Sequence, residues 1–271
     1  MSTQARRKLS AVFPDPLVKD QRVVFAESVL SIALVWWLAA TLFGITEVIS
    51  SPVLVVTAFY ELAVSMDWAP HLVATFRRTM YGFVVTVFVG SVLGIAMGVS
   101  DFWEKALQDY IIVGLALPSL FAAVFAAMWF GISDVTPMVA SAVIAFPFLT
   151  QNVYEGVDDI DHRLLEMSSA FGVSQTRNIR RVVVQSIMPS LFAGARYAFA
   201  ICWKITTLAE LVAAENGIGF MIEVQLTQRS ITGVLTWTLL FTLVLLVIEY
   251  GIFQRIERHV FKWRTESEIA W

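Results

Sequence analysis

Six long apolar runs, separated by shorter polar segments, dominate the pattern of this 271-residue chain. Each run is close to the roughly 20 residues that an α-helix needs to cross the hydrocarbon core of a bilayer. A helix also satisfies its own backbone hydrogen bonds, which lipid cannot do. The pattern therefore predicts an all-α membrane protein with six transmembrane helices. The predicted spans cover residues about 23–45, 72–99, 107–131, 136–154, 187–213 and 233–254.

The segments outside these runs complete the predicted organisation. Residues 1–22 and 255–271 are polar and basic, so we expect them to flank a transmembrane domain at 23–254. Between the first two spans, Ser51 and Pro52 open a short helical segment that continues through Glu61, and residues 67–70 end it. This segment is too short to be a further span, and it predicts an interfacial helix after the first span.

Glycines and prolines mark special positions within the spans. Gly90, Gly94 and Gly98 are four residues apart and form one stripe along the second span. Small residues at this spacing let helices approach closely, and we expect the stripe to serve packing within the subunit. Pro118 and Pro147 interrupt the third and fourth spans and predict kinks there.

Lysine and arginine positions predict the orientation in the membrane. With the N-terminus inside, the basic residues of both chain ends and of the segment 163–181 face the cytoplasm. The opposite face then holds little beyond Arg77, Arg78 and Arg229. Six spans bring both termini to the cytoplasmic side, so we expect a multi-pass membrane protein.

Composition narrows the possible functions. Charged residues make up 15% of the chain and hydrophobic residues 58%, whereas a soluble domain is about a quarter charged. A net charge of −3 supplies no basic field for nucleic acid. The single cysteine, Cys202, and three separated histidines predict no metal or redox cluster. We therefore expect membrane lipid as a partner, and neither redox chemistry nor nucleic-acid binding.

A polar segment at about 158–185 separates the fourth and fifth spans. Its first aspartates suit a helix N-terminus, and Gly172 suits the left-handed turn that ends a helix. Ser174 can cap the basic helix that follows. By its pattern alone, the segment is either a connecting loop or a docking element for a soluble partner.

The spacing of four residues in and just after this segment resembles the signature loop of bacterial ABC-importer permeases, and it favours the docking element over the connecting loop. These residues are Glu166, Gly172, Val182 and Pro189. Met167 and Ser168 replace the two alanines usual in that loop, and Val184 and Gln185 replace its Leu-Pro. Segments before and after the loop are also similar to permeases of the nitrate, sulfonate, taurine and bicarbonate branch. These segments are His71 to Gly82, Gly94 to Gly98, Gly194 to Arg196, Ala209 to Ala214 and Gly217 to Phe220.

The resemblance covers about residues 70–260 and implies a permease of the type I ABC importer kind. In that family the loop forms a cytoplasmic coupling helix that docks on a separate ATPase subunit. The chain contains no phosphate-binding loop, so the resemblance implies that ATP and Mg²⁺ bind the partner and that this chain has no cofactor. It also implies a permease homodimer and an extracytoplasmic substrate-binding protein. The implied docking residues are Arg163, Leu164, Leu165, Glu166, Ser169, Ala170 and Gly172.

Lys204 is the most costly residue of the predicted spans. A lysine near mid-span costs about 2.5–3.5 kcal/mol on insertion scales, so it should face water, a cavity or a carboxylate. In this branch of permeases a lysine at that depth suits an anionic solute such as nitrate, a sulfonate, bicarbonate or a carboxylate. The alternative is a structural pairing of Lys204 with Glu210 or a carbonyl. The pathway candidates are Lys204, Trp203, Thr207, Glu210 and Arg78.

Other functions remain open at this point. An ion-coupled secondary transporter needs carboxylates within its spans, and only Glu210 and Glu249 qualify. A permease of the same family could instead carry a neutral pyrimidine-type precursor. An integral-membrane enzyme needs a catalytic cluster, which the scattered histidines do not provide.

Overall fold

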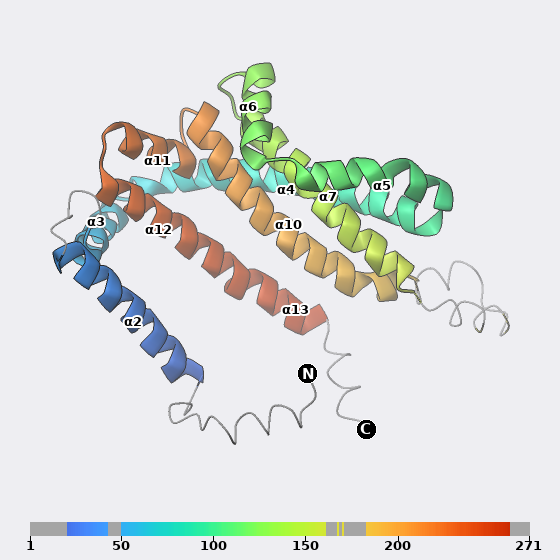
Figure 1. Ribbon diagram of the computed structural model, residues 1–271, viewed down its shortest axis with the longest axis horizontal. Coiled ribbons are helices and arrows are strands. Elements are labelled where there is room, and N and C mark those ends of the chain that lie inside the picture. Colours follow the sequence, from blue (N-terminus) through green and yellow to red (C-terminus); the bar gives the residue numbers. More distant parts are fainter. Residues whose placement is uncertain (1–20, 43–49, 161–166, 168–169, 171–182, 261–271) are drawn as a thin grey trace. The chain divides into compact units, whose positions relative to one another are not determined.

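The computed structural model describes residues 21–42, 50–160, 167, 170 and 183–260, and the regular elements in these ranges are all helices (Figure 1). The chain divides into two compact units, Met1–Ala58 and Phe59–Trp271. The first unit contains α2 (Gln21–Leu42) and the start of α3 (Pro52–Ser65). The elements of the second unit are α4 (Trp68–Val99), α5 (Asp101–Ala116), α6 (Ser119–Phe130), α7 (Val135–Asp158), α10 (Val184–Ala213), α11 (Ile218–Thr227), α12 (Ile231–Ile248), η2 (Glu249–Phe253) and α13 (Gln254–Val260).

In the first unit, α2 carries exposed apolar side chains along its length, Leu30, Ile32, Leu34 and Val35 among them. The indole N–H of Trp36 donates to the carbonyl oxygen of Ser50 at 3.0 Å and so joins α2 to the chain two residues before α3. Helix α3 begins at Pro52, where a proline suits the first helical position because no N–H is needed there. The predicted short helix after the first apolar run is therefore present.

Three long helices, α4, α7 and α10, pack against one another as the centre of the second unit (Figure 1). The glycine stripe of α4 faces α7. A Cβ on Gly90 would lie 2.9 Å from the Cβ of Leu149, and one on Gly94 would lie 2.7 Å from the carbonyl oxygen of Thr150. These contacts confirm the prediction that the stripe serves packing within one subunit.

We expect Gly94→Leu to lower the stability of the permease by about 1–3 kcal/mol, because a backbone carbonyl blocks the space that the side chain needs. The matched control is Val92→Leu, since the Val92 side chain is exposed on the same helix. Thermal unfolding in detergent measures both. Equal melting temperatures for the two variants would contradict the close packing of α4 on α7.

The third predicted span is broken rather than kinked. Helices α5 and α6 meet at an angle of 97°. Leu117 and Pro118 are both extended at the break, with ψ angles of 122° and 127°. Proline lacks an N–H and drives the residue before it out of the helical region, which explains the break. By contrast, Pro147 and Pro189 lie inside α7 and α10.

Two described helical stretches, Trp68–Val99 and Ile231–His259, are each long and apolar enough to cross a membrane. The bent pairs α5–α6 and α10–α11, the latter at 47°, add up to two more if each counts as one span. The described residues thus give two to four spans, and the count of six stays a prediction.

Candidate functional site

The most concentrated polar site of the second unit is a buried cluster of charges centred on Arg78. Its guanidinium donates to Glu210 Oε1 at 2.7 Å and, through Nε, to Asp134 Oδ1 at 2.8 Å. The side chains of Arg78 and Glu210 are 2% and 0% exposed, whereas Asp134 is 43% exposed. Arg78 also donates to the backbone and side-chain oxygens of Asn216, at 2.7 and 2.6 Å. Every buried charge here is paired, as burial requires.

Four separate segments supply this cluster. Arg78 lies on α4, Glu210 in the last turn of α10, Asp134 immediately before α7, and Asn216 in the connection between α10 and α11. Asp134 also forms an ion pair with Arg77, which is half exposed. The cluster therefore fixes the end of the helical unit at which α4 begins and α10 ends.

The same site caps the start of α11. The first N–H groups of a helix have no partner within the helix. Here the N–H groups of Ile218 and Gly219 donate to Thr75 Oγ1 at 2.8 Å and Glu210 Oε2 at 3.1 Å. The Thr75 hydroxyl in turn donates to Glu210 Oε2 at 2.7 Å. Both oxygens of Glu210 are thus engaged by protein groups.

Gly217 makes the sharp turn from α10 into α11 possible. Its φ of +116° is a conformation that glycine adopts readily and other residues rarely do. A side chain there would also collide with the carboxylate of Glu210. Close packing of the turn against Glu210 explains why a glycine occupies this position.

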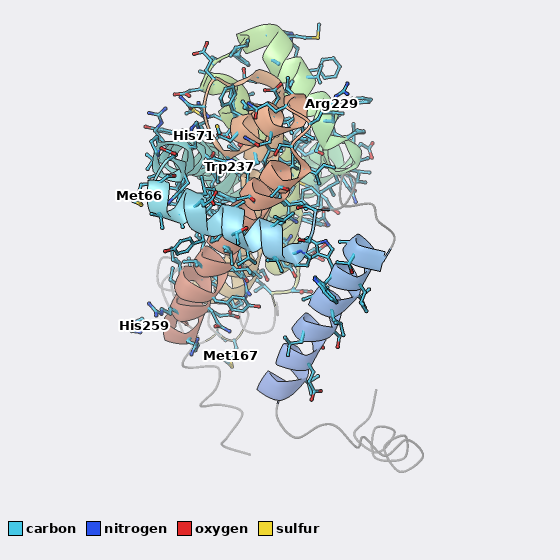
Figure 2. The ribbon with its side chains drawn as sticks, turned by 90° about the vertical axis from the view of Figure 1, so that its left-hand side faces the viewer. Met66, His71, Met167, Arg229, Trp237 and His259 are labelled. Carbon is cyan, nitrogen blue, oxygen red and sulfur yellow. The ribbon has the colours of Figure 1, made fainter. Side chains whose placement is uncertain are left out.

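His71 joins the turn to the last span. Its Nδ1 accepts from the N–H of Gly217 at 3.1 Å. Its ring meets Trp237 edge-on at a centroid distance of 5.6 Å and stacks with Phe220 at 6.4 Å. Figure 2 shows the labelled His71 and Trp237 close together. The ring therefore ties α4 to both α11 and α12.

The predicted pathway residues divide between two environments on α10. Trp203 is fully buried, stacks on Phe241 at 5.7 Å and donates to the carbonyl oxygen of Phe241 at 3.3 Å. Thr207 is also buried and donates to the carbonyl oxygen of Trp203 at 3.0 Å. Lys204 is exposed, and within the described ranges it has no ion-pair partner. The structural pairing of Lys204 with Glu210 is wrong, because Glu210 is bound to Arg78.

Tyr197 shares the exposed side of α10 with Lys204. It lies seven residues before the lysine, which places both side chains on one face two turns apart. Its side chain is 67% exposed. The sequence analysis missed Tyr197, although the seven-residue spacing is visible in the sequence.

The predicted ATPase-docking residues fall almost entirely outside the described part of the chain. Arg163, Leu164, Leu165, Glu166, Ser169 and Gly172 all lie there. Ala170 is helical and exposed, and so is Met167, which Figure 2 labels. Asp158 at the end of α7 and Val184 at the start of α10 bound this segment.

Metal binding finds no support in the described residues. Among them, no three histidine, cysteine or carboxylate side chains gather as a metal site. The carboxylates that an ion-coupled carrier would need are also occupied: Glu210 is paired with Arg78, and Glu249 with Arg196.

Comparison with protein families gives one match that covers most of the helical unit. The family described as "Binding-protein-dependent transport system inner membrane component" matches residues 86–262. Among solved structures, the chain is similar to the MetNI methionine ABC transporter in an inward-facing conformation. That similarity has a TM-score of 0.62 and 19% identity, and covers 72% of this chain and 98% of that one.

Curated relatives carry the names of transport permeases. SsuC of Bacillus subtilis, whose name assigns it to aliphatic sulfonates transport, is 26% identical over 82% of this chain and 80% of its own length. TauC of Escherichia coli, named for taurine transport, is 24% identical over 92% and 93%. ThiX of Halalkalibacterium halodurans, named for formylaminopyrimidine transport, is 23% identical over 88% and 94%.

Proposed function

Because the chain belongs to the family of binding-protein-dependent transport system inner membrane components, we propose that it is the transmembrane subunit of an ATP-driven importer for a small anionic solute. The solute arrives on an extracytoplasmic binding protein and crosses by alternating access. The pathway lies between two copies of this chain. Relatives named for aliphatic sulfonate and taurine transport support a sulfonate or a similar anion as the solute.

The observation that carries the anion proposal is the exposed lysine on α10. The helix around Lys204 is apolar, and the lysine has no carboxylate partner among the described side chains. A charged side chain within a span avoids lipid and faces water or protein. The exposed face of Lys204 and Tyr197 is therefore assigned to the pathway, with the ammonium group as donor to an anion. The opposite side of α10 is buried, and its packing there is supported by Trp203, Thr207, Glu210 and Arg78.

Energy enters through the segment from Arg163 to Gly172. In the proposal this segment lies in the cytoplasm as a coupling helix and docks on an ATPase subunit that holds ATP and Mg²⁺. Both chain termini lie on the same side, as the distribution of basic residues indicates. The large energy of ATP-driven switching suits this arrangement, since reversing a 1:99 equilibrium takes about 5.5 kcal/mol of differential binding.

A neutral pyrimidine-type precursor is the second candidate for the solute. The similarity to ThiX, named for formylaminopyrimidine transport, favours it. A neutral solute has no need of the Lys204 charge, so the two candidates differ in what removal of that charge does.

We expect Lys204→Ala to lower the apparent affinity for an anionic solute by about tenfold or more. The reason is the loss of one hydrogen bond to a charged group, which contributes about 1.5–3 kcal/mol. Solute uptake by the assembled transporter in vesicles measures the change in apparent affinity. Lys105→Ala is the matched control, since Lys105 is an exposed lysine on α5. An unchanged affinity in Lys204→Ala, with normal assembly, would favour the neutral solute.

A further inference from the structure

The last span contains one turn of π-helix, at Glu249–Phe253, between α12 and α13. Its wider turn is marked by the N–H of Gln254, which donates to the carbonyl oxygen of Glu249 five residues earlier. Single π turns within α-helices are frequent at functional sites. Side chains of this turn contact α10: Glu249 pairs with Arg196, and Phe253 lies against Phe199.

Arg196, in the first half of α10, binds carboxylates on both sides of the π turn. It forms an ion pair with Glu249 at the start of the turn and donates to Glu257 Oε2 on α13 at 3.0 Å. The three side chains are only partly buried, at 34%, 26% and 46% exposed respectively. One guanidinium thus holds two successive helical segments of the last span.

The π turn is what brings both carboxylates to one face. Glu249 and Glu257 are eight residues apart. Each residue of a regular α-helix turns by about 100°, so two side chains eight residues apart point in directions that differ by about 80°. A π turn contains one residue more than an α-turn. The eight-residue separation therefore acts as about seven residues of α-helix, which make about two full turns and leave the two side chains on the same face. A shift of this turn to regular α-helix would rotate Glu257 away from Arg196.

The packing around the turn is uneven. Phe253 is buried against Phe199 of α10, at a ring distance of 5.3 Å, and near Phe192 at 6.2 Å. On the other side, a Cβ added to Gly251 would meet nothing within 4 Å. The buried aromatic side fixes where the turn contacts α10, while the open side leaves room for a change of register.

We propose that Arg196 is a positioning residue of a register latch between α10 and the last span. In one register Arg196 holds Glu249 and Glu257 together; in the other the π turn has moved and Glu257 is released. This inference rests on the proposed function, because α10 is the helix that follows the coupling segment and would pass its movement to α13. The latch adds a route from that segment to the C-terminal end of the chain.

The first test is Glu257→Gln in the complete transporter, permease with its ATPase and binding protein, reconstituted in vesicles. The variant keeps the shape of the side chain but loses the charge that Arg196 binds. We expect solute uptake per ATP hydrolysed to fall about fivefold or more, as for coupled sites in general. Glu223→Gln is the control, since within the described ranges the Glu223 carboxylate accepts from Thr227 of its own helix and has no ion pair. Wild-type uptake per ATP in Glu257→Gln would overturn the latch.

The second test is deletion of Gly251, which turns the π turn into a regular α-turn without changing the phase of Glu257. Both ion pairs of Arg196 and assembly with the ATPase should survive, but the register can no longer shift. We expect ATP hydrolysis to continue with little uptake. Full uptake by the deletion variant would refute the register change. Failure of the wild-type complex to take up solute with ATP would instead refute the proposed function itself.

Discussion

Replacing Glu210 with alanine is expected to destabilise the permease by about 3–5 kcal/mol, the cost of leaving a buried charge without its partner. Arg78 would keep its charge in the interior with only the half-exposed Asp134 opposite it. The change also removes the acceptor for the Thr75 hydroxyl and the Gly219 N–H, so the start of α11 loses part of its cap. Thermal unfolding of the purified chain in detergent measures the loss.

Two variants make this result specific. Glu223→Ala removes a glutamate of α11 whose hydrogen bond among the described residues is to Thr227 of the same helix, and it should cost little. The double change Arg78→Met with Glu210→Leu should recover much of the stability, because an apolar pair of similar size can replace a buried ion pair. A double variant as unstable as Glu210→Ala would show that the cluster contributes something other than charge pairing.

Gly172→Asp is expected to abolish assembly of the permease with its ATPase while leaving the chain in the membrane. A residue that ends a helix in the left-handed conformation is glycine for steric reasons, and aspartate there would shift or melt the implied coupling helix. The measurement is recovery of the ATPase on tagged permease from solubilised membranes. We expect recovery at background level.

The control for this variant is Gly131→Asp at the C-cap of α6. Gly131 has a positive φ, of 65°, and nothing lies within 4 Å of its added Cβ. The same substitution there should leave ATPase recovery intact, since Gly131 lies at the end of α6 and outside the coupling segment. Wild-type recovery with Gly172→Asp would contradict the docking role of residues 163–172.

Hydrophobic pattern and small-residue spacing were enough to predict the helical class and a tight approach of α4 to another helix, which the structure identifies as α7. The glycine stripe is informative because its spacing matches one face of a helix, whatever the partner is. Where a helix breaks was harder to predict. Pro118 breaks the chain by 97°, whereas Pro147 stays inside α7. The sequence contains a proline in both places, so a proline alone does not distinguish a break from a continuous helix.

The buried charge cluster around Arg78 could not be predicted from the sequence. Arg78 and Glu210 are 132 residues apart, so no local pattern joins them. Sequence analysis placed Arg78 on the outer face and listed it as a pathway candidate, and it gave no sign that Arg78 is a buried charge paired with Glu210. Adjacent residues on a helix differ in direction by about 100°, and this explains why Lys204 is exposed beside the buried Trp203.

An ion-coupled mechanism loses support for the same reason. Its two candidate carboxylates, Glu210 and Glu249, each bind an arginine. A carboxylate that is paired with an arginine is not free to bind and release a cation, and for Glu210 breaking the pair would leave the buried Arg78 charge unpaired at a large cost. The family match and the occupied carboxylates both favour an external source of energy.

Solute uptake into sealed vesicles tests the central claim most directly. The permease is reconstituted with its ATPase and binding protein, and uptake of a sulfonate is followed with ATP or with an ion gradient alone. The account predicts uptake only when ATP and the ATPase are both present. Uptake by the permease alone, driven by the ion gradient, would contradict it.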